Sequence, residues 1–164
     1  MKKVLLVIMT VVFFTGLLQA QNPVPKELVE KPWGGFSEQS ANFTKSGKIQ
    51  LVQTLRLTLN SDNSVSGTSS SKMILDGVSY SNINYINGTF YPSNWTVYIQ
   101  DGTSTYTDVL PYSLRWCKGT GTLQFYTNAT HPGYYILKGN ISDDCGGNSL
   151  IEFTDYPNAY KQNN

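Results

Sequence analysis

The sequence is poor in the residues that most often carry catalysis or bind metals. Its 164 residues contain one histidine, His131, and only 14% of them are charged. His131 stands in the turn-like stretch NATHPGYY, and no Gly-x-Ser-x-Gly segment supplies a nucleophile turn for it to activate. The acidic stretches NSDN and DDCGGN lack the ligand spacing of a calcium loop, and no pair of carboxylates is singled out. We therefore expect a protein that is not an enzyme, without catalytic residues, metal or cofactor.

Positive charge is scarce as well. When the two lysines at the extreme N-terminus are set aside, 10 basic residues face 11 acidic ones, and no basic stripe is present. A nucleic-acid partner would need such a stripe to neutralise phosphates, so we do not expect one. A long amphipathic helical period is also lacking, which argues against a helix that lies on a membrane surface.

The one long hydrophobic run stands at the N-terminus. Lys2 and Lys3 precede an apolar stretch over residues 4–18, and Ala20 follows it. This order predicts a secretory signal peptide over residues 1–20, with an uncleaved membrane anchor as the alternative. The residue after Ala20 is Gln21 rather than cysteine, so no lipid anchor is indicated. We expect a secreted or periplasmic protein with no membrane span after cleavage.

What the chain does contain is the two-residue period of β-strands. The clearest case is residues 49–59, where Leu55, Leu57 and Leu59 alternate with polar residues such as Arg56. One face of a strand with this pattern is buried. We predict that the three leucines point into the core and that Arg56 points to water.

Similar short runs follow one another along the chain. We expect residues 21–32 to be a proline-containing extended leader with one possible helical turn over 26–30, and residues 157–164 to be a flexible tail. Between them, the domain over residues 33–156 carries about eight or nine strands, with turns at 60–64 and at the Asp76-Gly77 pair. We also expect a break over residues 100–105 and a strand over 112–117.

The strands are best joined into a single antiparallel up-and-down β-barrel of about eight strands, with a β-sandwich as the alternative. Short turns connect consecutive strands, as a meander requires. Gly67, Gly88, Gly121 and Gly139 stand at positions where a strongly coiled strand favours a residue without a Cβ atom. Closure would also remove the exposed edges of an open sheet.

The two cysteines, Cys117 and Cys145, predict a disulfide. In an exported chain, two cysteines form one bridge more often than anything else. The metal-binding alternative lacks a recognised spacing, because the nearby candidates are only His131 and two aspartates.

Aromatic residues provide the best functional lead, since the chain has 11 tyrosines and three tryptophans. Inside a barrel, tyrosines make an apolar wall with polar tips, suited to a small apolar or amphipathic ligand. On an outer face they make a stacking platform for a glycan or a protein partner, and many of them serve only packing. The candidate ligand-binding residues are Trp33, Tyr85, Tyr98 and Tyr126.

Three short motifs resemble a known family. They are Trp33-Gly34-Gly35, then Ser66-Gly67-Thr68, and the late frame with Trp116-Cys117, Gly139, Cys145-Gly146 and Leu150-Ile151. Over roughly residues 33–154 the chain resembles the small secreted lipocalin-like (calycin-type) barrels of Bacteroidetes-type bacteria. The resemblance implies an eight-stranded barrel with one open end, a first-strand tryptophan that plugs the closed end and, in the ligand-binding members, an apolar pocket. It implies no catalytic residues.

Overall fold

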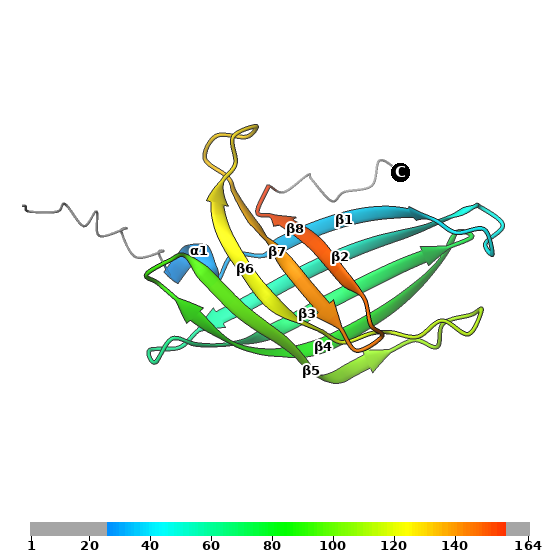
Figure 1. Cartoon of the computed structure of the whole chain (residues 1–164), viewed down its shortest axis with the longest axis horizontal. Coiled ribbons are helices and arrows are strands. Elements are labelled where there is room, and N and C mark those ends of the chain that lie inside the picture. The colour runs from blue at the N-terminus through cyan, green and yellow to red at the C-terminus, as the bar shows by residue number, and fades with distance from the viewer. Residues whose placement is uncertain (1–25, 157–164) are drawn as a thin grey trace, which may run out of the picture.

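The computed structural model describes residues 26–156, which form one closed antiparallel β-barrel (Figure 1). Each strand pairs with the next one along the chain, and β1 also pairs with β8, so the topology is up-and-down. This confirms the predicted barrel and excludes the sandwich. The predicted signal peptide and the predicted tail lie outside the described residues. The strands are β1 Trp33–Ser40, β2 Lys48–Leu59, β3 Ser64–Leu75, β4 Val78–Tyr91, β5 Thr96–Thr107, β6 Gly119–Thr127, β7 Tyr135–Asp143 and β8 Asn148–Thr154.

One end of the barrel is closed by the segment that precedes β1. The helical turn predicted in the leader is formed as α1, Lys26–Val29, and its Leu28 and Val29 are buried in the core. The Trp33 indole Nε1–H donates to the carbonyl oxygen of Val29 at 3.5 Å. The described part of the leader therefore belongs to the packed barrel. Among the described residues, no helix has the length and hydropathy to cross a membrane.

The leucine alternation in β2 is confirmed. Leu55 and Leu57 are buried, Leu59 packs against the core, and Arg56 is exposed. These leucines join Trp33 and side chains from every other strand in one apolar cluster. The buried members of that cluster are Leu28, Val29, Trp33, Leu55, Leu57, Val65, Ile86, Phe90, Val97, Ile99, Leu123, Phe125, Leu137 and Phe153.

The sharp coiling of the sheet depends on glycine at the predicted corners. A Cβ atom built on Gly67 would collide with the carbonyl oxygen of Arg56 on β2, and one on Gly88 would collide with that of Tyr98 on β5. Backbone of the neighbouring strand cannot give way as a flexible side chain can. Any other residue would therefore force the strands apart and weaken the barrel.

Two sequence predictions about the strands are wrong. The break expected over 100–105 does not occur, because β5 continues to Thr107 and absorbs the irregularity as register shifts against β4. The strand expected over 112–117 is not formed, because Tyr112 and Ser113 both have φ of 58°, which is incompatible with extended backbone. That segment belongs to the connection between β5 and β6.

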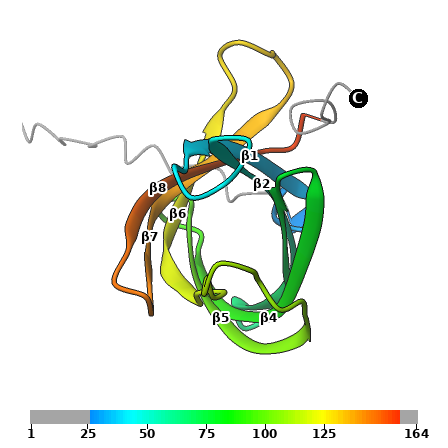
Figure 2. The ribbon, with the colours of Figure 1, turned by 90° about the vertical axis from the view of Figure 1, so that its right-hand side faces the viewer.

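The strands are unequal in length, and this divides the barrel into two halves. β5 pairs with β6 only from Thr96 to Gln100, and β1 pairs with β8 only at Gly34–Thr154. The remaining parts of β1 to β5 project beyond β6, β7 and β8, toward the right in Figure 1. We call the half with α1 and Trp33 the closed half and the projecting half the open half. Figure 2 views the barrel from the end of the open half.

Candidate functional site

The candidate site is the interior face of the open half. Strand register identifies this face, because residues directly opposite one another in a sheet point to the same side. Leu55 of the core lies opposite Ser69, and Ser69 lies opposite Asn84. The inward-facing polar residues of β2 to β5 in this half form what we call the polar layer. Its members are Gln53 of β2, Ser69 and Ser71 of β3, Asn82 and Asn84 of β4, and Asp101, Ser104 and Thr107 of β5.

Two asparagines form the most buried part of the polar layer. Asn82 and Asn84 are each 3% exposed. The Nδ2–H of Asn82 donates to Oδ1 of Asn84 at 3.2 Å. Burial of amide groups is unfavourable unless they are hydrogen-bonded. The pair is held by neighbours on β5, since Thr107 Oγ1 donates to Oδ1 of Asn82 at 2.6 Å and Ser104 Oγ donates to Oδ1 of Asn84 at 2.7 Å.

Asp101 brings the negative charge of the polar layer. Its Oδ1 accepts a hydrogen bond from Ser69 Oγ at 2.8 Å, and its Oδ2 accepts one from the Gly119 backbone N–H at 3.0 Å. These bonds join β5 to β3 across the interior and to the start of β6. They also place the carboxylate where the closed half meets the open half.

An apolar layer lies beyond the polar layer, toward the open end. Leu51 of β2 lies opposite Met73 of β3, and Met73 lies opposite Tyr80 of β4. All three are only half-buried although they point inward, as are Gln53, Ser69 and Ser71. Solvent therefore reaches these positions of the interior face, although Leu75, the next inward residue along β3, is buried. The inward residues of the closed half are almost completely buried. We call Leu51, Met73 and Tyr80 the apolar rim.

Loops gather at the open end around Asp76, in the β3–β4 turn. Asp76 Oδ1 accepts from the Ser46 backbone N–H at 2.7 Å, and its Oδ2 accepts from the Tyr112 hydroxyl at 2.9 Å. Phe43 and Tyr112 also meet edge to face at 5.6 Å between ring centroids. The bond from Ser46 is the main reason why the pKa of Asp76 lies below its ordinary value, and the bond from Tyr112 adds to it. The ionised form of Asp76 thus ties both loops to the turn.

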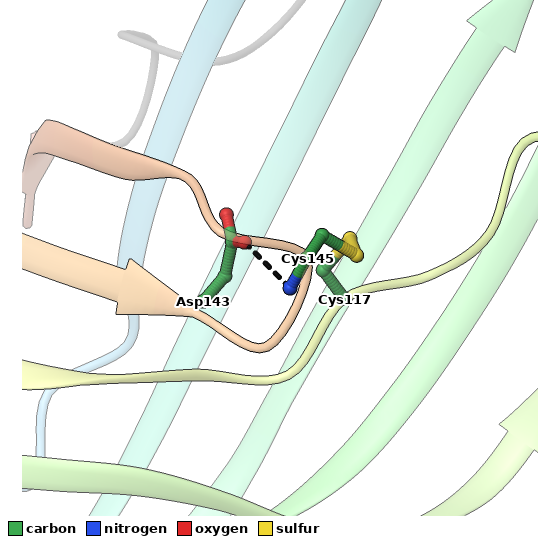
Figure 3. Close-up of side chains that lie close together, drawn as sticks. All are labelled: Cys117, Asp143 and Cys145. Carbon is green, nitrogen blue, oxygen red and sulfur yellow. Dashed lines mark hydrogen bonds between the residues drawn. A yellow bond between two sulfur atoms is a disulfide. The ribbon is translucent and has the colours of Figure 1, made fainter.

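The predicted disulfide is formed between Cys117 and Cys145, whose Cα atoms are 5.7 Å apart (Figure 3). It joins the β5–β6 connection to the β7–β8 turn. The Asp143 carboxylate lies beside it, close enough for the three side chains to share one ion. However, Asp143 Oδ1 accepts from the backbone N–H groups of Cys145 and Gly147, at 2.9 and 2.8 Å. With both sulfurs in the bridge and this oxygen engaged in the turn, the cluster has a structural role.

The four predicted ligand-binding aromatics are not brought together. Trp33 is fully buried in the closed half, against Phe125. Tyr85 and Tyr126 are exposed on the outer face, by 55% and 46%. Tyr98 also points outward, where its hydroxyl accepts a hydrogen bond from Thr120 Oγ1 at 2.9 Å. None of the three tyrosines lines the interior, so any ligand that they bind would lie on the outer surface.

Sequence reasoning missed the asparagine pair. The only available signal was polar residues at alternate positions, Asn82 and Asn84, within a strand whose other positions hold Ile83 and Tyr85. The alternation is plain, but it suggests the opposite orientation, with the apolar residues inside.

Comparison with family models, curated proteins and solved structures found no match to this chain. The lipocalin-like resemblance of the sequence remains a prediction.

Proposed function

We propose that the protein is a secreted, non-enzymatic binding module that holds a small amphipathic molecule inside the open half of its barrel. The observation that carries this proposal is the buried asparagine pair on an interior face that lies outside the main apolar core. The apolar rim next to the polar layer supports it, because an amphipathic ligand needs both kinds of surface. The resemblance to lipocalin-like barrels leads in the same direction.

The test measures binding of a neutral apolar dye, N-phenyl-1-naphthylamine, by the increase in the fluorescence of the dye. Ser71 faces inward between Gln53 and Asn82, so the change Ser71→Trp fills the interior of the open half. The preceding residue, Ser70, is also half-buried but faces outward, so Ser70→Trp is a matched control.

We expect the dye to bind the unchanged protein and the Ser70→Trp variant, and to lose most of its fluorescence enhancement with Ser71→Trp. Equal binding by both variants would place the dye elsewhere on the molecule and contradict an interior site.

Export is part of the same proposal. The basic, apolar and small-residue order of the N-terminus supports cleavage after Ala20. Mass spectrometry of protein recovered outside the cytoplasm should find a chain that begins at Gln21. Recovery of a chain that still carries residues 1–20 would contradict it.

A second candidate function is glycan binding on the outer face of β4 and β5. Ile83 lies opposite Tyr106, and Tyr85 is the next outward residue along β4. Both tyrosines are more than half exposed and offer ring faces for stacking on a sugar. A glycan array should then show signals that Tyr85→Ala removes and that Tyr126→Ala, on β6, leaves unchanged.

A further inference from the structure

We propose that the group bound by the polar layer is neutral and accepts a hydrogen bond, as the carbonyl oxygen of an amide or ester does, and that Nδ2 of Asn84 donates to it. This inference rests on the proposed function and names the class of ligand. It depends on three properties of the open half, namely a free amide donor, the sign of the interior charge and the position of the apolar rim.

The free donor is the Nδ2 amide of Asn84. Oδ1 of the same side chain accepts from Asn82 and from Ser104, and Nδ2 has no acceptor among residues 26–156. Within this range, the only side-chain nitrogen or oxygen that is both sealed from solvent and unpartnered is Trp95 Nε1, so Nδ2 of Asn84 keeps contact with solvent. A nearly buried donor of this kind gains most from a ligand that brings an acceptor.

The interior charge disfavours an anionic ligand. Asp101 is the only aspartate, glutamate, lysine, arginine or histidine in the polar layer and the apolar rim. It bonds to Ser69, the residue directly opposite Asn84, so its carboxylate lies next to the proposed head-group position. A carboxylate head would be repelled there without a basic partner, whereas a neutral carbonyl would not.

The apolar rim determines what is attached to the head group. Tyr80 of the rim is four residues from Asn84 along β4, with Asn82 between them. Four residues of a strand span about 13 Å. A ligand whose carbonyl reaches Asn84 therefore crosses the polar layer first and reaches the rim with the far end of its chain, and that end should be hydrocarbon.

The experiment compares two probes with the same chain, octanamide and octanoate, by calorimetric titration of the full mature protein at pH 7. We expect octanamide to bind about tenfold more tightly or better, as one charge repulsion or one hydrogen bond would produce. This comparison needs no variant, so it tests the inference even if substitutions in the interior impair folding.

Variants then show which residues cause the preference for octanamide. Asn84→Leu should reduce octanamide affinity about tenfold and bring it closer to the affinity for octanoate. Asn87→Leu, on the outer face of the same strand, should change neither affinity. Asp101→Asn should improve octanoate binding. If neither probe binds, the proposed function fails. If octanoate binds as tightly as octanamide, or if Asn84→Leu keeps the full preference, the head-group inference is overturned and the proposed function stands.

Discussion

The two halves of this barrel share β1 to β5 but are stabilised differently. In the closed half, inward side chains from all eight strands, with Leu28 and Val29 of α1, form one apolar cluster. In the open half, inward side chains come mainly from β1 to β5 and are largely polar. Most of them remain partly exposed, although Asn82, Asn84 and Leu75 are buried. Burial of apolar surface is the main stabilising term in folding, so the closed half should carry most of the free energy of unfolding. Because the open half contributes less to stability, its inward side chains can be polar and can serve binding.

The largest expected difference compares two leucines on the same face of β2. Leu57 is buried in the closed half, and Leu57→Ala should lower the free energy of unfolding by about 2–5 kcal/mol. Leu51 is half-buried in the open half, and Leu51→Ala should lower it by about 1 kcal/mol or less. Denaturant unfolding of both variants measures the difference, with Thr58→Ala as an outward-facing control.

Equal losses for the two leucines would contradict the division into halves. A larger loss for Thr58→Ala than for Leu57→Ala would contradict the register of β2 itself, because a shift by one residue exchanges the two faces of a strand.

The second prediction concerns how much the disulfide adds to the stability of the barrel. It closes a loop with a sequence separation of 28, for which restriction of the unfolded chain predicts about 3.5 kcal/mol of stabilisation. The paired change Cys117→Ser and Cys145→Ser should lower the unfolding free energy by about this amount. Thiol labelling of the unfolded, unreduced protein should modify neither cysteine, and labelling of both would show that the bridge is not present in solution.

The sequence was most informative where burial and alternation agree. Leu55, Leu57 and Arg56 could be assigned because a strand with one apolar face has only one favourable orientation in water. The glycine corners and the disulfide were also predictable, since each follows from a specific steric or chemical requirement.

The open half could not be predicted in the same way. Asn82 and Asn84 point inward while Ile83 and Tyr85 point outward, so alternation gives the wrong face unless the pairing of β4 with β3 is known. The Asp101-Gly102 pair has the composition of a turn, yet it lies within β5, because register shifts in the pairing with β4 absorb the irregularity there. Long-range pairing decides both cases, and it is not encoded in the local pattern.

A smaller effect is expected from the hydrogen-bonded network of the polar layer. Asn84→Ala leaves the Ser104 hydroxyl and the Asn82 amide without their acceptor, which should cost about 1–3 kcal/mol. Asn87→Ala, on the outer face, should cost less than about 0.5 kcal/mol. Thermal or denaturant unfolding compares the two. A negligible loss for Asn84→Ala would indicate that water satisfies these groups as well as the asparagine does, and that the open half gains no stability from its polar layer.

The smallest expected effect is a difference in acid stability between the open end and the rest of the barrel. The pKa of Asp76 is lowered mainly by the Ser46 backbone N–H, so the folded protein favours the ionised carboxylate more strongly than the unfolded chain does. Stability from this group is complete above the ordinary aspartate pKa near 4 and is lost as the pH falls through the lowered folded value. Acidification below about pH 4 should therefore release the loops that carry Ser46 and Tyr112 before the closed half unfolds.

Hydrogen exchange at pH 3 and pH 6, corrected for intrinsic rates, tests this order, and Asp76→Asn should expose the same loops already at pH 6. Asp62 is the matched control. Its pKa is also lowered, mainly by the Ser64 hydroxyl, but it lies in the β2–β3 turn at the other end. Asp62→Asn should leave the loops around Asp76 protected. If acid exposed the closed half and the open end together, the two halves would unfold as one cooperative unit. The halves would then differ in amino-acid composition but not in stability.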